Sequence, residues 1–363
     1  MEENKYTDEF FEKFEQRYKK SSESDSLAKH KRVKRNNGKK IALCLTAVVL
    51  VIAIVLMIVL LGKQPNSLSG NENAIKGADI IENVPNEPEE PVIINPYVEP
   101  DENTVSLAAD VNSEYAVLIE RETGRIVGQR NYDSKVYPAS LTKIMTLLVA
   151  VEENKDLNAT FEMTFEIIDP LYRQEASLAG FTGGEKVKVI DLMYGAILPS
   201  GADATCGLAI HTAGSEAAFV ELMNKKVQQL GLKNTHFANT SGLHDPQNYT
   251  TVYDMAIILK AASENELAKE ILSTYQYTTN PTPEHPDGIL LTSTLFSRMY
   301  GTEPKNGAVI EGGKTGFINE SGNCIASYGT SQSGKEYIFV SCGAKGLWKA
   351  VFDHINTYAK YVN

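Results

Sequence analysis

The stretch PASLTKIMTLLVAVEE, residues 138–153, joins a polar, strand-like segment to an apolar run of helical character. It predicts a long helix that begins at about Ser140. Residues three apart share a face of a helix, so the Ser140 hydroxyl and the Lys143 amine are expected within hydrogen-bond reach. Such a pair could act as nucleophile and base, because a lysine accepts a serine proton only when burial or a neighbouring cation keeps the amine neutral.

The spacing by itself is a weak signal. Serine followed by lysine three residues later recurs in SLAK, residues 26–29, where the surroundings are polar and offer no site. Taken alone, a helix cap at Ser140 and a solvated amine at Lys143 explain the stretch as well as catalysis does. The choice between these interpretations depends on the rest of the chain.

The surrounding segments predict strands at both ends of a globular region and helices in its middle. Strand patterns occur at residues 114–120 and 125–130, joined by the turn RETG, and again at residues 312–318, 323–330 and 336–343. Helical patterns occur at residues 187–200, 201–214, 215–231, 251–265 and 347–362. This order predicts an α+β domain in which the two ends of the chain build a mainly antiparallel sheet with helices packed on it.

Two further stretches carry polar residues of the same chemistry. LPSGADA, residues 198–204, places Ser200 at a helix start, and EGGKTGFINESGNC, residues 311–324, places Lys314, Thr315 and Gly316 in a strand. The order Ser-x-x-Lys, then a second serine, then Lys-Thr-Gly is the pattern of penicillin-binding proteins and serine β-lactamases. The three motifs together favour the catalytic interpretation of the first one.

The chain resembles one branch of these proteins more closely, the serine D-alanyl-D-alanine carboxypeptidases of the low-molecular-mass penicillin-binding group. The resemblance covers about residues 105–363 and is carried by YPASLTKIMTLL, GEKVKVIDLMYGAILPSGADA, NTHFANTSGLHDPQNYTTVYDMA and GGKTGFINESGNCIAS. It implies the β-lactamase and penicillin-binding-protein fold, an antiparallel sheet beside a helical cluster. It implies hydrolysis through an acyl-enzyme with no metal and no organic cofactor, and β-lactam antibiotics as covalent inhibitors.

The resemblance also implies roles for the motif residues. Ser140 would attack the carbonyl between the two terminal D-alanines of a peptidoglycan stem peptide, and Lys143 would act as general base. Ser200 would relay a proton between Lys143 and the leaving amine. Lys314 and Thr315 would hold the terminal carboxylate of the substrate, and the charge of Lys314 would help to keep Lys143 neutral.

The backbone completes this implied site. Gly316 would let its strand approach the substrate closely, and the N–H groups of Ser140 and Phe317 would form the oxyanion hole. One position departs from the family pattern, because Ala202 stands where Ser-x-Asn motifs carry an asparagine. The loss of that amide predicts a slower enzyme, by about ten- to a hundredfold, rather than an inactive one. Asp203 is interpreted as a partner of the helix dipole and not as a replacement.

The histidines are interpreted as structural. His244, in SGLHDPQNYTT, lies in a loop where Asn239, Gly242 and Asp254 are expected to fix a turn and a helix cap. The spacing of the other histidines outside the first forty residues fits no metal site; these are His211, His236, His285 and His354.

A membrane anchor is predicted near the amino end. Residues 41–62 carry no charge and are long enough to cross a bilayer as a helix. The basic run KHKRVKRNNGKK precedes them, which places residues 1–40 in the cytoplasm as a tail and the rest of the chain outside. Residues 63–103, rich in Asn, Pro and Glu, read as an extracytoplasmic linker to a catalytic domain at residues 104–363.

The net charge of the chain narrows the classes of possible partner, and its cysteine content limits the possible disulfides. The chain carries a net charge of −11, and because residues 1–40 are net basic, the exterior part is more acidic still, which disfavours nucleic acid as a partner. Cys206, Cys324 and Cys342 lie outside the predicted anchor. Buried thiols are the default interpretation, and a bridge between Cys324 and Cys342 stays open.

Three functions are compatible with the sequence. The first is a membrane-anchored carboxypeptidase that trims peptidoglycan, or an endopeptidase that uses the same site on cross-links. A β-lactamase is disfavoured, since no Glu-x-x-x-Asn loop provides a separate deacylation base. The third is a wall-binding or β-lactam-sensing homologue with little turnover, for which Ala202 is the only support.

Overall fold

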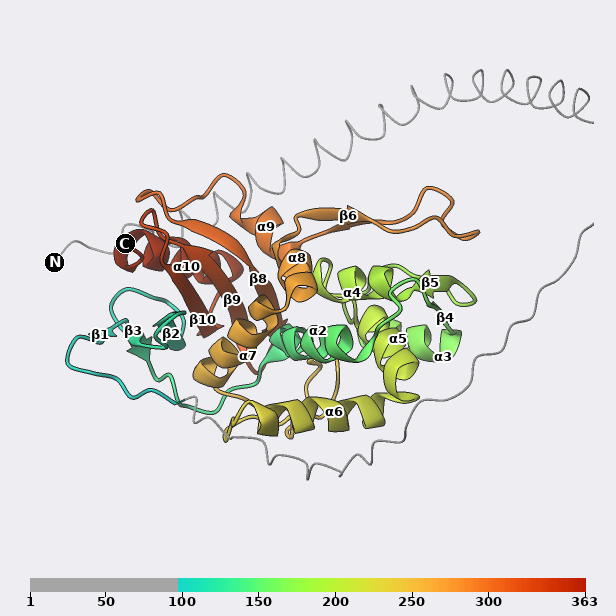
Figure 1. The fold of residues 1–363 in the computed structure, drawn as a ribbon, viewed down its shortest axis with the longest axis horizontal. Coiled ribbons are helices and arrows are strands. Elements are labelled where there is room, and N and C mark those ends of the chain that lie inside the picture. The colour runs from blue at the N-terminus through green and yellow to red at the C-terminus, as the bar shows by residue number, and fades with distance from the viewer. Residues whose placement is uncertain (1–96) are drawn as a thin grey trace, which may run out of the picture. The chain divides into compact units, whose positions relative to one another are not determined.

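The computed structural model describes residues 97–363, and its centre is a six-stranded sheet in the order β1-β3-β2-β10-β9-β8 (Figure 1). The strands are β1 Val105–Ser106, β2 Tyr115–Glu120, β3 Ile126–Arg130, β8 Val309–Ile318, β9 Gly322–Thr330 and β10 Glu336–Ala344. Every neighbouring pair is antiparallel except β1 with β3. Because β2 pairs with β10, the two ends of the domain meet in one sheet, which confirms the prediction.

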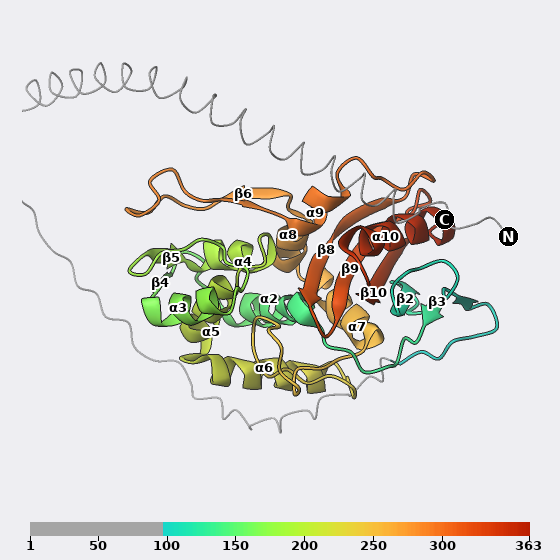
Figure 2. The same cartoon turned by 180° about the vertical axis from the view of Figure 1, so that it is seen from behind.

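Helices pack on this sheet and form a cluster beside it. They are α2 Thr142–Glu153, α3 Phe165–Arg173, α4 Val189–Ile197, α5 Ala202–Ala213, α6 Glu216–Gln229, α7 Val252–Glu264, α8 Glu266–Ser273, α9 Thr294–Met299 and α10 Leu347–Tyr361, with a 3-10 turn, η1 Ala139–Leu141, before α2. Alternate residues of a strand point to opposite faces, so Val117 packs in the core with α7 while Leu118 packs with α10. Figures 1 and 2 show α2 to α6 gathered at one side of the sheet.

Helix α2 is the centre of that cluster. Its residues from Thr142 to Ala150 are all buried, and it contacts α4, α5, α6, α7 and α8. A helix surrounded on all sides needs apolar residues around its whole circumference, which explains the run IMTLLVA. The start of α2 therefore lies between the sheet and the helical cluster.

Several short elements had no clear sequence signal. Helix α3 contains Pro170, and α9 has only six residues. The hairpins β4 Thr160–Glu162 with β5 Lys186–Lys188, and β6 Gln276–Thr278 with β7 Leu290–Thr292, are formed by strands of three residues each. Figure 1 shows the β6–β7 arm reaching out above α4, where the buried Asp191 carboxylate accepts a 2.8 Å hydrogen bond from the Tyr277 hydroxyl.

The predicted tail, anchor helix at residues 41–62 and most of the linker lie outside the described residues. None of the helices within residues 97–363 combines the length and apolar character that a bilayer-spanning helix needs. Residues 97–103, the end of the predicted linker, lie against the domain. Tyr97 stacks on Tyr253 with 5.6 Å between ring centroids, and its hydroxyl donates to the Asp254 carboxylate at 2.8 Å.

The cysteines outside the predicted anchor are buried free thiols. Cys206, Cys324 and Cys342 form no disulfide in the described part of the chain. Cys324 on β9 and Cys342 on β10 are joined by a hydrogen bond instead, which lowers the pKa of Cys324 and raises that of Cys342. The bridge that the sequence left open is therefore absent, and the buried-thiol interpretation holds.

Candidate active site

Ser140 lies in η1 on a backbone held in an unusual conformation. Ala139, just before it, has a φ of +48°, in the left-handed region that costs an alanine free energy. Gly242 packs against the Ala139 carbonyl so closely that a Cβ on Gly242 would lie 1.8 Å from that oxygen. Since Gly242 itself has a φ of +81°, only glycine fits there, and its loop fixes the backbone of Ser140.

The same loop positions an acceptor for Lys143. The Asn239 side chain accepts from the Gly242 N–H at 2.7 Å and donates to the Leu243 carbonyl at 2.9 Å, which closes a tight turn. The Ser241 carbonyl inside this turn accepts a 2.5 Å hydrogen bond from Lys143 Nζ, and that Nζ lies 3.2 Å from Ser140 Oγ. The structure thus brings Ser140 and Lys143 together and orients the amine with a backbone oxygen.

Of the three residues expected to fix the turn and cap, Asn239 and Gly242 form the turn. The next helix, α7, is capped by Thr251, whose hydroxyl accepts from the Asp254 N–H at 3.0 Å. The Asp254 carboxylate instead accepts from the Thr235 hydroxyl at 2.7 Å, as well as from Tyr97. Asp254 therefore ties distant segments together in addition to its place in the first turn of α7.

Burial sets the charge state of the lysines. Lys143 is 2% exposed, and burial lowers its pKa to about 8, although nearby Cys206 and Asp203 act to raise it. Burial also lowers the pKa of Lys314 well below its ordinary value, helped by the charges of Lys143 and Arg298. Lys314 was expected to help keep Lys143 neutral; burial is the main cause of the low Lys143 pKa, and the charge of Lys143 lowers the pKa of Lys314.

Strand β8 brings the Lys-Thr-Gly motif against the nucleophile. Lys314 is buried, and its Nζ donates to the Thr315 carbonyl at 2.8 Å. The Thr315 hydroxyl shares a 2.7 Å hydrogen bond with Thr294 at the start of α9. A Cβ on Gly316 would lie 3.1 Å from the Ser140 nitrogen, so a side chain there would crowd the backbone beside the nucleophile.

Ser200 lies just before α5 and lines the same cavity as Ser140 and Lys143. Its φ is +67°, it is 6% exposed, and its hydroxyl has no hydrogen-bond partner within residues 97–363. Such a buried, unpaired hydroxyl in a cavity is available to a substrate. Ala202 packs with Leu171 and Cys206, and the Asp203 carboxylate accepts from the Ala179 N–H at 2.8 Å. The Asp203 carboxylate is therefore hydrogen-bonded to the backbone and does not replace the missing amide.

Most of these groups line one cavity of about 580 Å³, but the buried Lys314 is not among its lining residues. Its lining includes Ser140, Lys143, Ser200, Ala202, Thr315, Gly316 and Phe317. The side chain of Phe317 is 57% exposed at the mouth of the cavity. The role expected for this residue lies in its backbone N–H and not in its side chain. Arg298 on α9 also lines the cavity, and sequence analysis missed it because no motif marks this short helix.

His244 lines the cavity but lies away from the reacting pair. Its ring packs edge-on against Tyr137, 4.9 Å between centroids, and its Nδ1 lies 3.9 Å from the Glu320 carboxylate. His354 is buried between the hydroxyls of Ser327 and Ser341, and burial lowers its pKa to about 3, so it is neutral in the core. These positions agree with the structural interpretation of both histidines.

Known proteins are similar to this chain in sequence and in fold. The model of the D-alanyl-D-alanine carboxypeptidase family matches residues 101–346. The D-alanyl-D-alanine carboxypeptidase DacF of Bacillus subtilis (strain 168) is 33% identical over 230 residues, covering 62% of this chain and 55% of that protein. The corresponding DacA of Haemophilus influenzae is 35% identical over 230 residues, covering 61% and 55%. The chain spans about half the length of the curated relatives it matches.

Among solved structures, the Streptomyces K15 DD-transpeptidase superposes with a TM-score of 0.60 at 27% identity, over 69% of this chain and 97% of that one. This likeness confirms the penicillin-binding-protein and β-lactamase type of fold that the sequence predicted. The family match spans most of the described domain and contains the Ser-x-x-Lys, second-serine and Lys-Thr-Gly motifs. On this evidence, the chain belongs to the D-alanyl-D-alanine carboxypeptidase family.

Proposed function

We propose that the protein is a membrane-anchored serine carboxypeptidase that removes the terminal D-alanine from peptidoglycan stem pentapeptides and is acylated by β-lactams. One observation carries this proposal: a buried amine with a pKa of about 8 lies 3.2 Å from a serine hydroxyl at the floor of an open cavity. The similarity to DacF and DacA, both named D-alanyl-D-alanine carboxypeptidases, supports the choice of substrate.

In the first step, Ser140 Oγ attacks the carbonyl carbon of the penultimate D-alanine while Lys143 Nζ takes the hydroxyl proton. The resulting oxyanion is held by the N–H groups of Ser140 and Phe317. The C–N bond then breaks, and the proton passes from Lys143 through the Ser200 hydroxyl to the departing amine. An unpaired Ser200 hydroxyl beside the cavity supports this relay.

The terminal carboxylate selects the substrate through two cations. Lys314 and Arg298 meet it together with the Thr315 hydroxyl. In the empty enzyme the pKa of Lys314 is low because the amine is buried beside other cations. An arriving carboxylate restores the Lys314 charge, and that charge opposes protonation of Lys143. Binding of the correct substrate therefore favours the neutral base that acylation needs.

Hydrolysis of the acyl-enzyme uses the same base. After D-alanine leaves, water takes its place, Lys143 accepts a water proton, and the hydroxide attacks the ester carbonyl. The ester C–O bond breaks and Ser140 recovers its proton from Lys143. Because the K15 protein is named a DD-transpeptidase, an amine acceptor in place of water is the second candidate.

The anchor is part of the proposal. Residues 41–62 would hold the chain in the membrane with the catalytic domain outside, where stem peptides are found. A linker of about forty residues spans tens of ångströms even as a relaxed coil, since its mean end-to-end distance grows as roughly 5–6 Å times the square root of its length. The domain could then reach wall strands from the membrane surface.

The proposal is tested by D-alanine release from an acyl-D-Ala-D-Ala peptide, using the full chain in detergent beside a Ser140→Ala variant. We expect release by the wild type and none by the variant. Retained acylation by a fluorescent penicillin without D-alanine release would overturn the carboxypeptidase in favour of a sensor. Transfer of the acyl group to an added amine, outrunning hydrolysis, would favour the transpeptidase instead.

A further inference from the structure

Two cysteines lie side by side on neighbouring strands of the central sheet. In the β9–β10 ladder Ser341 pairs with Ile325, and the next residues are Cys342 and Cys324, where the register shifts at a bulge. Both side chains are 1% exposed and belong to the same apolar core. Opposed residues of an antiparallel pair have Cα atoms about 4.5–5.5 Å apart, a separation that a disulfide can bridge.

The pair lies beneath the turn that carries the nucleophile. Cys324 is also the partner of Gly316 in the β8–β9 ladder, and opposed residues point to the same face of a sheet. That face packs against η1, because a Cβ on Gly316 would lie 3.1 Å from the Ser140 nitrogen. A chemical change at Cys324 therefore occurs one strand away from the backbone that holds Ser140.

The two thiols differ in acidity. The hydrogen bond from Cys342 lowers the pKa of Cys324, whereas the same contact and burial raise the pKa of Cys342. Since the thiolate is the reactive form of cysteine, Cys324 should react first with an oxidant, and Cys342 is placed to react with the product. Cys206 on α5 provides a comparison, because burial raises its pKa to about 12 although it is 9% exposed.

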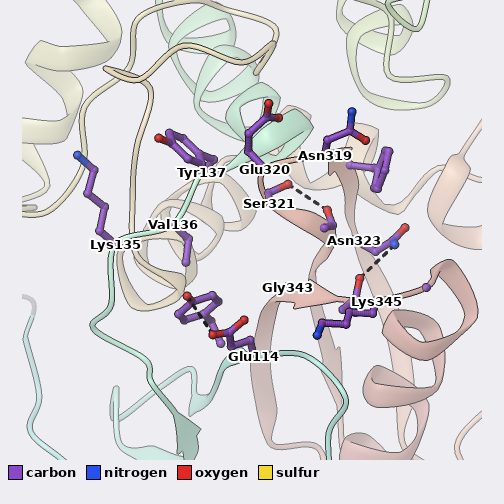
Figure 3. A pocket seen from close by; sticks show the side chains of 15 residues that line it. Glu114, Lys135, Val136, Tyr137, Asn319, Glu320, Ser321, Asn323, Gly343 and Lys345 are labelled. Atoms are coloured by element: carbon purple, nitrogen blue, oxygen red, sulfur yellow. Dashed lines mark hydrogen bonds between the residues drawn. The ribbon is translucent and has the colours of Figure 1, made fainter.

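A cavity of about 550 Å³ beside the β8–β9 turn brings small molecules close to both thiols (Figure 3). Its lining includes Gly322 and Asn323, just before Cys324, and Gly343, just after Cys342. The two glycines have no side chain to thicken this wall, and the bulge interrupts the ladder at the same place. Because the thiols themselves are buried, we expect a small oxidant such as hydrogen peroxide to reach them and a bulky reagent to be excluded.

We propose that Cys324 and Cys342 form a redox-sensitive pair, which hydrogen peroxide converts into an inter-strand disulfide and which thiol reductants restore. The Cys324 sulfur attacks one peroxide oxygen, the O–O bond breaks, and water leaves with the Cys324 proton, so that a sulfenic acid forms. The Cys342 sulfur then attacks the Cys324 sulfur, the S–O bond breaks, and a second water leaves with the Cys342 proton. Each sulfur gives up one electron, and the peroxide takes up both.

The pair protects the core beneath Ser140. Without a second thiol, a sulfenic acid at Cys324 would be oxidised further to a sulfinic acid, which thiol reductants do not reverse. A charged sulfinate in the apolar core would destabilise the fold. The disulfide is uncharged and restricts the unfolded chain, so it should stabilise the fold instead. Such a bridge would persist in the exterior position proposed for the domain.

The test treats the reduced full chain in detergent with hydrogen peroxide, blocks the remaining thiols and maps the cysteine peptides by mass spectrometry without reduction. We expect the peptides of Cys324 and Cys342 to be linked, with a mass about 2 Da below their sum, and dithiothreitol to release them. Cys206 should stay a thiol. The melting temperature should rise by roughly 5–10 °C on oxidation and return on reduction.

Two single variants separate the roles of the thiols. In Cys342→Ala, peroxide should add about 32 Da to the Cys324 peptide, irreversibly, and lower the melting temperature. In Cys324→Ala, Cys342 should remain a thiol. Two free thiols in the peroxide-treated wild type, a bridge to another cysteine, or oxidation of Cys206 before Cys324 would overturn the proposal, and the wild-type map decides this even if a variant fails to fold. No readout depends on D-alanine release, so the outcome is independent of the proposed function.

Discussion

Raising the pH from 6 to 9 should switch on acylation, because Lys143 must be neutral to take the Ser140 proton. With a pKa of about 8, Lys143 is about 1% neutral at pH 6, half neutral at pH 8 and about 90% neutral at pH 9. The second-order acylation constant should therefore rise about fiftyfold from pH 6 to pH 8 and less than about twofold from pH 8 to pH 9. A lysine with its ordinary pKa of 10.5 would still gain tenfold per unit at pH 9.

The assay follows the full chain reacting with a fluorescent penicillin, at constant ionic strength, with far-UV circular dichroism to confirm the fold at each pH. A flat profile, or a rate that continues to climb tenfold per unit beyond pH 9, would refute Lys143 as a base made neutral by burial. Lys314→Met provides a second check. Since burial is the main cause of the low Lys143 pKa, the midpoint should move by less than about one unit.

Further substitutions separate folding from chemistry. Ser200→Ala should leave the free energy of unfolding within about 0.5 kcal/mol of the wild type, because the Ser200 hydroxyl has no partner in residues 97–363, yet it should lower kcat at least about tenfold. Chemical denaturation measures the first effect and D-alanine release the second, and a loss of stability would contradict the role of Ser200 as a proton relay. Gly242→Ala should cost more than about 1 kcal/mol and slow acylation, since its Cβ would meet the Ala139 carbonyl at 1.8 Å; a normal melting temperature with full acylation would oppose this. Ala202→Asn should raise kcat/KM by about tenfold, with Ala202→Leu as the steric control, and no gain would mean that the amide is not missed. Relative to Lys143→Met, the wild type should gain about 3 kcal/mol of stability between pH 8 and 10.5, because the unfolded chain keeps the Lys143 proton to a higher pH than the folded chain does. Denaturant titrations of both proteins at pH 8 and pH 10.5 test this gain, and the same change in stability for both proteins would contradict it.

The sequence predicted the groups whose chemistry lies in their side chains. Ser140, Lys143 and Ser200 were found because hydroxyl and amine side chains recur in fixed motifs, and the structure gathers them around one cavity. The sheet was predicted because its long strands, β8 to β10, carry apolar and glycine-rich patterns that a helix would not. Short elements such as the six-residue α9 gave no period to detect.

Features that depend on backbone groups, or on contacts between residues far apart in the sequence, could not be predicted from the sequence. The Ser241 carbonyl orients Lys143, but every residue has a backbone carbonyl, so no residue type in the sequence identifies this acceptor. The left-handed Ala139 follows from contact with Gly242, about a hundred residues away in sequence. Arg298 reaches the cavity because α9 packs on β8, a contact that only the folded chain reveals.

The position of Lys143 explains why so much of the fold surrounds one short motif. An amine with a pKa of about 8 in place of 10.5 costs about 3 kcal/mol at neutral pH, since each unit is worth about 1.4 kcal/mol. That cost is a large part of an ordinary domain's stability of about 5–15 kcal/mol. The nine consecutive buried residues at the start of α2, packed by five other helices, supply apolar burial that offsets it. In the proposed mechanism, the burial of the amine that costs stability also makes Lys143 a base. Loosening the packing around α2 should therefore let water in, raise the Lys143 pKa and weaken catalysis before the fold is lost.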